Sequence, residues 1–306
     1  MHLRDILVRS ERTFSFEFYP PRSDAAAEEL LATMGEFERL RPTFVSVTYG
    51  AGGTTRERTH HLVTRLAKET SLDPMPHLTC VCHDETEIAR ILERYAAAGI
   101  SNIMALRGDL PESGAASRGS FRYASELVRM IRRFGEQGGH PDRRGFGVGV
   151  AGYPEGHPGT PNRLLEMDHL KAKVDAGADV IVTQLFFDNR DFYDFRERCL
   201  LAGIKVPVIA GIMPVTTAAG MKRMAELAGG TRFPAGLLRA VNRAGSDDAA
   251  LARVGVHWAT EQCRDLLDHD VAGIHFYTLN RSPATREIYA SLGVKDSLAL
   301  IGQGGY

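Results

Sequence analysis

Hydrophobic and polar positions along the chain follow two alternating patterns. The first is a short run of apolar and β-branched residues, typical of a buried strand, and it recurs eight times. These runs occupy residues 13–20, 43–50, 77–82, 102–109, 146–154, 179–187, 207–214 and 273–280. They are apolar throughout, which is typical of parallel strands covered on both faces.

The second pattern lies between the runs, where apolar residues recur at spacings of three and four and so share one face of a helix. In residues 24–40 that face carries Leu30, Met34 and Phe37. Further helices are predicted at residues 55–69, 84–98, 121–134, 165–176, 190–202, 216–228 and 283–292. Residues 229–271 are longer than one crossover needs, and we expect extra helices there.

Strand–helix alternation repeated eight times predicts an α/β fold, a single (β/α)8 barrel of the TIM type with extra helices before the last strand. No linker or change of composition divides the chain, so residues 1–306 are expected to form one domain. A doubly wound open sheet is the structural alternative.

Composition narrows the class of partner. The net charge of −1 gives no electrostatic reason to expect nucleic acid or an anionic membrane surface, which favours a small molecule. Four cysteines in 306 residues do not make a disulfide framework. The polar N-terminus lacks the apolar core of a signal peptide, and no run approaches the roughly 20 apolar residues of a membrane span. We therefore expect a cytoplasmic protein.

Polar residues gather at the ends of the predicted strands, where barrel chemistry is found. Each has a structural explanation as well, such as a helix cap, a core histidine or a rim tyrosine. Because seven of the eight strands direct polar groups to one face, the joint pattern favours a functional site. The residues are Glu17, Thr48, Tyr49, His77, Thr79, Arg107, Asp109, Tyr153, His157, Gln184, Tyr277, Asn280 and Arg281.

The most unusual of these is Glu17, in the middle of the run "FSFEFYPP". Alternation places Ser15 and Tyr19 on the same side as Glu17, while the neighbouring phenylalanines face the other way. A carboxyl group inside a barrel loses water, which raises its pKa and suits a general acid near neutral pH. The structural alternative is an ion pair that closes the barrel, with Arg281 as the candidate partner.

Two motifs resemble known binding sites, but the residues around each motif argue against such a site. The stretch "GVGVAG" (147–152) matches a dinucleotide-binding glycine pattern, but it lies inside a predicted strand and "YPEGHP" follows instead of a helix. Cys80 and Cys82 lie in "CVCH", but no second pair of ligands has matching spacing. We expect packed thiols and no metal site.

With these residues placed, the chain resembles the methylenetetrahydrofolate reductase family from end to end. The resemblance rests on nine motifs in order: "FSFEFYPPR", "FVSVTYGAGGTTRERT", "PHLTC", "ALRGDLP", "YPEGHP", "LKAKVDAGAD", "TQLFFDN", "GIMPVT" and "HFYTLNRSPAT". It implies a catalytic barrel that binds FAD at its carboxyl face. It also implies that NADH or NADPH reduces the flavin, which then reduces 5,10-methylenetetrahydrofolate to 5-methyltetrahydrofolate.

The resemblance also implies roles for individual residues. Glu17 matches the family's general acid, and Asp109 of "RGD" matches a carboxylate that stabilises the cationic intermediate and tunes the flavin. The residues expected to contact substrate are Glu17, Asp109, Gln184, Tyr277 and Arg281. Those expected to hold FAD are Thr48, Tyr49, His77, Arg107, Gly108, Asp109, Tyr123, Ala124, Tyr153, His157, Glu166 and Lys173.

The chain differs from the family pattern at four positions, of which two are among or beside the residues expected to hold FAD. Glu166 stands where many members have aspartate, and Ala172 replaces a basic residue beside Lys173. Gly220 and Met224 stand where some relatives have a folate-binding glutamine and a stacking phenylalanine. These departures bear on how tightly flavin is held and on how ligands stack.

Two other functions remain open from the residues alone. One is a phosphate-binding barrel lyase or aldolase, although "MPVTT" and "LNRSPAT" lack the glycine-rich anion loop of that class. The other is a non-catalytic folate- or flavin-binding protein. The choice between NADH and NADPH is also open, and a homo-oligomer is expected only by analogy with relatives.

Overall fold

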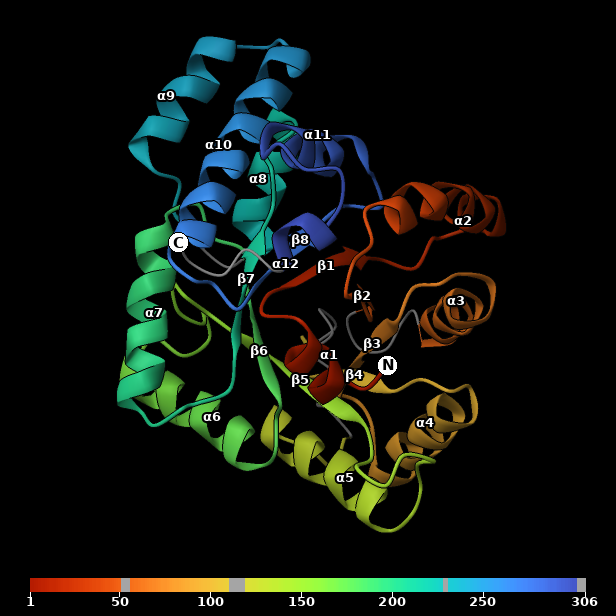
Figure 1. The fold of residues 1–306 in the computed structure, drawn as a ribbon. Helices are drawn as coiled ribbons and strands as arrows, with labels where there is room; N and C mark the ends of the chain where they lie inside the picture. Colours follow the sequence, from red (N-terminus) through yellow and green to blue (C-terminus); the bar gives the residue numbers. More distant parts are fainter. Residues whose placement is uncertain (51–55, 110–118, 228–230, 302–306) are drawn as a thin grey trace.

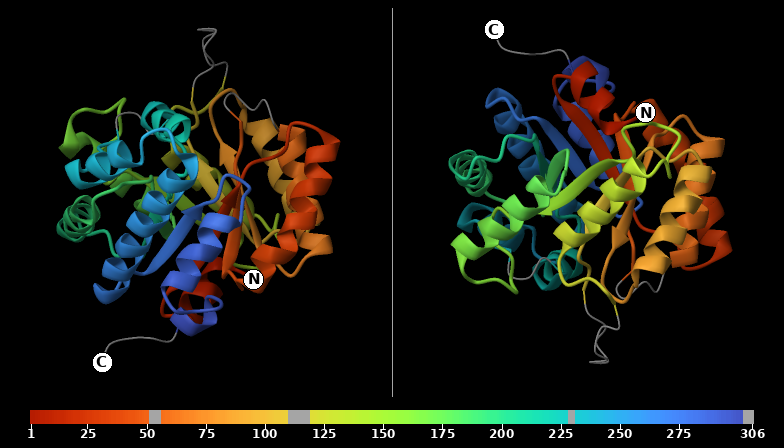
Figure 2. Two further views of the ribbon diagram at one scale, coloured as in Figure 1. Left: turned by 90° about the horizontal axis from the view of Figure 1, so that it is seen from above. Right: turned by 90° about the horizontal axis from the view of Figure 1, so that it is seen from below.

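A computed structural model of the protein describes residues 1–50, 56–109, 119–227 and 231–301. Eight parallel strands close into a barrel in the order in which they occur in the sequence, and helices surround it (Figures 1 and 2). The strands are β1 (Thr13–Phe18), β2 (Phe44–Val47), β3 (Pro74–Thr79), β4 (Asn102–Leu106), β5 (Gly147–Gly152), β6 (Val180–Thr183), β7 (Val208–Ile212) and β8 (Gly273–Tyr277). The predicted barrel is therefore confirmed, and the open-sheet alternative is wrong.

The helices that alternate with the strands also lie where the apolar spacing predicts them. They are α2 (Asp24–Arg39), α3 (Arg56–Glu69), α4 (Glu85–Ala97), α5 (Ala124–Glu136), α6 (Arg163–Asp175), α7 (Asn189–Leu201), α8 (Ala218–Leu227) and α11 (Pro283–Ser291). The extra helices before the last strand are α9 (Ala235–Ala244) and α10 (Asp248–Asp268).

Two helices were not predicted. One is the short α12 (Leu298–Ile301), and the other is α1 (Leu3–Arg9), which packs at the amino end of the barrel. Leu3 and Ile6 of α1 are buried in one cluster with Phe44, Met75 and Met104 from the strands. Helix α1 therefore covers the apolar interior of the barrel at the end opposite to the carboxyl ends of the strands.

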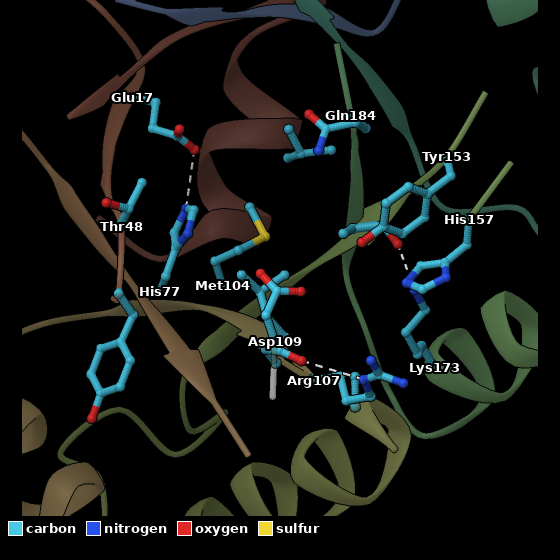
Figure 3. Close-up of a pocket in the computed structure, with 18 of the residues that line it drawn as sticks. Glu17, Thr48, His77, Met104, Arg107, Asp109, Tyr153, His157, Lys173 and Gln184 are labelled. Carbon is cyan, nitrogen blue, oxygen red and sulfur yellow. Dashed lines mark hydrogen bonds and ion pairs between the residues drawn. The ribbon is translucent and has the colours of Figure 1, made fainter. Parts of the chain in front are cut away.

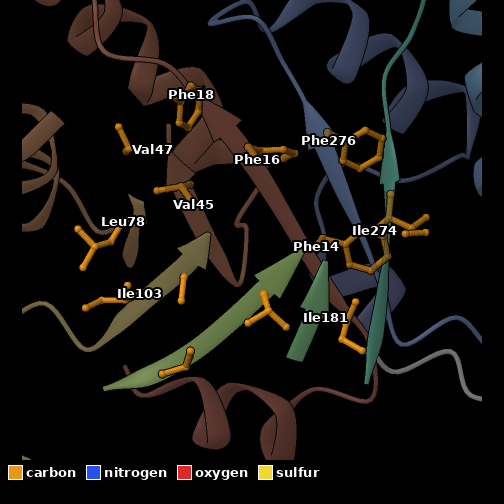
Figure 4. Close-up of a cluster of buried hydrophobic side chains, with 14 of the residues drawn as sticks. Phe14, Phe16, Phe18, Val45, Val47, Leu78, Ile103, Ile181, Ile274 and Phe276 are labelled. Atoms are coloured by element: carbon orange, nitrogen blue, oxygen red, sulfur yellow. The ribbon is translucent and has the colours of Figure 1, made fainter. Parts of the chain in front are cut away.

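The outer faces of the strands form the main hydrophobic core with the surrounding helices (Figure 4). On β1, Phe16 and Phe18 point outward and their rings contact Phe37 of α2 at centroid distances of 5.3 and 4.8 Å. This packing confirms that the phenylalanines of the "FSFEF" run face away from the barrel interior. Glu17 between them must then face inward, because side chains alternate along a strand.

On β3, the inward-facing positions change from apolar to polar along the strand. On β3, Met75 belongs to the apolar cluster at the amino end, whereas His77 two residues later lines a cavity. On β6, Val182 belongs to the same apolar cluster but also lines the cavity, together with Gln184, which follows the strand. The barrel interior therefore holds an apolar cluster at the end covered by α1 and polar side chains at the carboxyl ends of the strands.

The fold explains why the glycine motif and the cysteine pair do not form the binding sites that they resemble. The "GVGVAG" glycines form β5, and the next helix, α6, begins only at Arg163, so the pattern does not open a helix. Cys80 is fully buried, and burial raises the pKa of its thiol to about 11. Cys82 is only half-buried, so it is less packed than expected.

Candidate functional site

A cavity of about 480 Å³ opens at the carboxyl ends of the strands. This volume lies in the usual range for small-molecule sites. Almost every residue predicted to bind cofactor or substrate lines it: Glu17, Thr48, Tyr49, His77, Arg107, Gly108, Asp109, Tyr123, Ala124, Tyr153, His157, Glu166, Lys173, Gln184 and Tyr277. The exception is Arg281, which is exposed on the loop after β8 and is not among the lining residues.

Glu17 lies at one wall of the cavity beside two histidines (Figure 3). Its Oε2 atom is 3.4 Å from Nε2 of His77 and 3.8 Å from Nε2 of His275. Only 19% of the Glu17 side chain is exposed. Glu17 forms no ion pair with Arg281, so the proposed barrel-closing pair is absent and the carboxyl group faces imidazoles instead.

The two histidines beside Glu17 are buried from bulk water. Burial lowers the pKa of His77, and the opposing effect of nearby Glu17 does not reverse this shift. His275 is held between two hydroxyl groups, with Nδ1 2.7 Å from Oγ of Ser15 and Nε2 3.3 Å from Oγ of Ser46. A neutral His77 offers the Glu17 carboxyl group little charge compensation.

Tyr277 at the end of β8 and Gln184 just after β6 line the cavity on either side of β7. The Tyr277 hydroxyl donates a hydrogen bond of 2.7 Å to the carbonyl oxygen of Thr183, and burial raises its pKa well above the usual value. The Gln184 Oε1 atom accepts a 2.9 Å hydrogen bond from the backbone N–H of Leu185. Its amide group remains available to a ligand because this bond uses only one acceptor position.

Basic side chains line another part of the cavity, where Lys173 and His157 lie beside Tyr153 (Figure 3). The Lys173 ammonium donates a hydrogen bond to the carbonyl oxygen of Ala151, and burial lowers the pKa of Lys173 to about 8. Burial also raises the pKa of the neighbouring Glu166, whose buried Oε2 has no hydrogen-bond partner in the described part of the chain.

Flat rings lie along the same side of the cavity. Tyr153 meets His157 edge to face at a centroid distance of 4.7 Å, and burial raises the pKa of Tyr153 to about 12. Tyr123 stacks on His169 at 5.0 Å, with the planes 28° apart. Aromatic surfaces of this kind suit a ligand that contains planar rings.

Tyr49 is positioned by a buried histidine below the cavity wall. His83 Nδ1 lies 2.9 Å from the carbonyl oxygen of Val81, so Nδ1 carries the proton. His83 Nε2 can then accept from the Tyr49 hydroxyl at 3.1 Å and from Arg56 at 2.8 Å. Burial lowers the pKa of His83, which is consistent with this neutral acceptor.

Gly108 allows the chain to turn tightly between Arg107 and Asp109. Its φ of +83° is unfavourable for residues with a side chain, and an added Cβ would lie 2.7 Å from Cβ of Thr79 and 2.9 Å from Cγ1 of Val81. The absence of a side chain here therefore fixes the positions of both charged neighbours at the cavity.

We expect Gly108→Ala to lower the free energy of unfolding by about 1–3 kcal/mol, since backbone strain and overlap act together. Gly138→Ala is a matched control, because Gly138 has a φ of +78° but nothing within 4 Å of an added Cβ. Chemical denaturation should give a larger loss for Gly108→Ala. Equal losses would show that overlap with Thr79 and Val81 does not matter.

Sequence reasoning did not single out several lining residues, including His275, Tyr19, Leu279 and His169. His275 could have been found, because it precedes Tyr277 by two positions and so shares its face of β8. Three of the four departures from the family pattern are not among the residues that line the cavity. They are Ala172, Met224, which is buried in a separate apolar cluster, and Gly220, whose N–H donates to Oγ1 of Thr217.

Within the described ranges, no helix is long and apolar enough to span a bilayer. The described residues also contain no group of three or more histidine, cysteine, aspartate or glutamate side chains arranged to hold a metal ion. The cavity lining includes carboxyl groups, histidines, cations and aromatic rings.

Comparison with known proteins agrees with this arrangement. The family model for methylenetetrahydrofolate reductase matches residues 2–293. The chain is 37% identical over 293 residues to 5,10-methylenetetrahydrofolate reductase of Escherichia coli K12, covering 95% of this chain and 94% of that protein. It is 36% identical over 307 residues to methylenetetrahydrofolate reductase (NADH) 1 of Arabidopsis thaliana, covering 96% of this chain but only 50% of that protein.

A solved structure resembles the fold at lower identity. It is an uncharacterised protein from Clostridium thermocellum that binds two copies of 5-methyl-5,6,7,8-tetrahydrofolic acid. The TM-score is 0.67 and the identity is 14%, with 94% of this chain and 95% of that chain covered. At this identity the likeness concerns the fold alone.

Fold and site together define a (β/α)8 barrel whose polar cavity lies at the carboxyl ends of its strands. The sequence matches then place it more narrowly. The chain belongs to the methylenetetrahydrofolate reductase family.

Proposed function

We propose that this protein reduces 5,10-methylenetetrahydrofolate to 5-methyltetrahydrofolate, with FAD relaying hydride from NADH or NADPH and Glu17 acting as general acid. The observation that carries the proposal is the position of Glu17, a largely buried carboxyl group in the same cavity as Asp109 and Lys173. Family membership and the names of the relatives support the reductase activity.

The cavity has the features that FAD requires. Lys173 and Arg107 line it, and cations of this kind suit a pyrophosphate, while His157 adds a hydrogen-bonding group beside them. Gly108 leaves backbone exposed where a side chain would overlap, and the Tyr123–His169 and Tyr153–His157 pairs offer flat surfaces. We propose that these residues, with Thr48, Tyr49, His77, Asp109, Ala124 and Glu166, hold the cofactor. When bound, FAD would supply a two-electron carrier that accepts hydride from one substrate and gives it to the other.

Glu17 would transfer its proton to N10 of the folate while the bond between N10 and the bridging methylene carbon breaks. The electron pair of that bond goes to N10, and the methylene group remains on N5 as an iminium cation. Hydride addition to this carbon gives the N5-methyl product. A proton from solvent then restores the Glu17 carboxylic acid, so that the overall reaction consumes one hydride and one proton.

Asp109 would stabilise the cationic intermediate through its negative charge, and Gln184 would bind the folate through its side-chain amide. Tyr277 adjoins Glu17 in the paired strands β1 and β8, and its hydroxyl is held by Thr183, so we propose that it shapes the wall against which the substrate rests. Arg281 lies outside the cavity lining, and a role for it requires contact with a part of the substrate beyond the mouth.

The proposal is tested by an absorption spectrum of the purified protein, followed by anaerobic addition of each nicotinamide. We expect a flavin spectrum that bleaches with NADH or NADPH and returns with 5,10-methylenetetrahydrofolate. A colourless protein that does not respond to nicotinamide would contradict the flavin relay and favour a lyase. Tight folate binding without turnover would indicate a non-catalytic binding protein.

The same titration would decide which nicotinamide is preferred, since no glycine fingerprint with a ribose-binding acid is present in β5. A cytoplasmic location and assembly into a homo-oligomer stay predictions.

A further inference from the structure

We propose that Tyr19 and Leu279 form an apolar rim that binds the aminobenzoyl ring of the folate substrate. This inference rests on the proposed function, because it names the part of that substrate which contacts the cavity mouth. Both residues line the cavity, and each is 45% exposed, so both side chains are accessible to a ligand at its mouth.

The other tyrosines that line the cavity have side-chain partners within the protein, through either the hydroxyl group or the ring. Tyr49 bonds to His83 and Tyr277 to the Thr183 carbonyl, while Tyr153 and Tyr123 contact histidine rings, as described above. For the Tyr19 side chain, the described ranges contain no hydrogen bond and no ring partner. Its aromatic face is therefore free to receive a ligand.

The backbone of this rim is fixed by an unusual arrangement on the loop after β8. The Asn280 side chain accepts a 2.9 Å hydrogen bond from the Tyr19 N–H and donates one of 2.9 Å to the Tyr19 carbonyl oxygen. Thr278 adds a hydrogen bond of 2.6 Å from its hydroxyl to the carbonyl oxygen of Glu17. The loop is thus attached to β1 at Glu17 itself and at Tyr19.

Leu279 between these contacts has a φ of +51°, and Asn280 has a φ of +60°. A left-handed backbone is common for asparagine but unfavourable for a bulky residue such as leucine. Such strain persists where the surrounding structure imposes it, and it clusters at ligand sites. Here the Asn280 and Thr278 contacts impose it, and they present an apolar side chain to solvent at the cavity mouth.

The chemistry of the substrate identifies the group that would lie on this rim. Glu17 must reach N10, and the aminobenzoyl ring is bonded directly to that nitrogen. Tyr19 follows Glu17 by two residues, a distance of about 7 Å along an extended chain. A ring bonded to N10 therefore lies next to Tyr19 and Leu279 when Glu17 is in position to deliver its proton, and an aromatic ring gains from stacking on tyrosine.

The test compares binding of 5-methyltetrahydrofolate with binding of a methylated tetrahydropterin that lacks the aminobenzoyl group. In calorimetry we expect Tyr19→Ala to weaken 5-methyltetrahydrofolate about tenfold, while the truncated pterin binds as it does to the unmodified protein. Leu279→Ala should act in the same direction, and Tyr19→Phe should retain most of the affinity. Leu200→Ala, which removes a 66% exposed leucine from α7, is the control without effect.

Kinetic measurements distinguish an effect on folate binding from an effect on the reaction with nicotinamide. Tyr19→Ala should raise KM for 5,10-methylenetetrahydrofolate and leave anaerobic flavin reduction by NADH or NADPH unchanged. Equal weakening of both pterins, or slowed flavin reduction with unchanged folate binding, would overturn the assignment. The rim assignment also fails if Tyr19→Ala binds 5-methyltetrahydrofolate normally, whereas the proposed function fails if the unmodified protein shows no reductase activity.

Discussion

Glu17→Gln is expected to slow the reduction of 5,10-methylenetetrahydrofolate about 10³-fold, the usual contribution of a general acid. Glutamine has nearly the same shape but holds no transferable proton, so the bond to N10 cannot be broken with its assistance. Flavin reduction by nicotinamide requires no proton from Glu17 and should persist. Stopped-flow measurement of the two half-reactions separates these effects.

Glu155→Gln is the matched control for this prediction. Glu155 is also a partly buried carboxyl group, in the turn after β5, and burial raises its pKa, but it does not line the cavity. Its replacement should leave both half-reactions close to those of the unmodified protein. A Glu17→Gln enzyme with a full-rate folate half-reaction would remove Glu17 from the proton transfer.

Asp179→Ala is expected to lower the free energy of unfolding by about 3–5 kcal/mol, because it leaves a buried cation without its partner. The Asp179 side chain is 5% exposed and lies 2.6 Å from Nη2 of Arg132 and 2.7 Å from Nε of Arg4. It also accepts a 2.8 Å hydrogen bond from the Val148 N–H. These contacts connect α1, α5 and β5, and urea denaturation would measure their loss.

The acid stability of the protein should depend on the same aspartate. Burial alone would raise the pKa of Asp179, but Arg132, the Val148 N–H and Arg4 outweigh it and the net shift is downward. The stabilisation is therefore fully present above the aspartate pKa of the unfolded chain and is lost as the pH falls through the lowered pKa of the folded state. Asp179→Ala should show a weaker dependence on acid pH.

Asp5→Ala provides the comparison, since Asp5 binds Arg144 in an exposed pair at the same end of the barrel. Exposed pairs contribute little, and its denaturation midpoint should hardly move. If Asp5→Ala and Asp179→Ala unfold at the same denaturant concentration, burial of the Asp179 pair is not what stabilises this end of the barrel.

The sequence was sufficient to predict the barrel because its strands and helices have different apolar periods, and each segment is long enough to show its own. The inward direction of Glu17 was predictable for the same reason, since phenylalanines alternate with it. Helix α1 was not predicted, because its seven residues span only two turns, and of its four apolar residues only Leu3 and Ile6 are buried.

Contacts between residues of different strands were harder to predict from the sequence than the side of its own strand on which each residue lies. Alternation predicts which residues of β8 point inward, but the pairing of His275 with Ser15 depends on the register between β1 and β8. The same limit applies to Asn280, whose hydrogen bonds to Tyr19 join positions 261 residues apart. Roles in catalysis and cofactor binding came from resemblance to a family, since geometry alone does not specify a substrate.

Apolar and polar positions inside the barrel are under different evolutionary constraints, the first on stability and the second on ligand binding. Met75 and His77 lie two residues apart on β3, yet the first fills the sealed interior and the second meets the ligand cavity. Substitutions at the depth of Met75 can therefore be selected for thermal tolerance with little consequence for turnover. Substitutions at the depth of His77 can diversify the chemistry while the scaffold beneath keeps its shape.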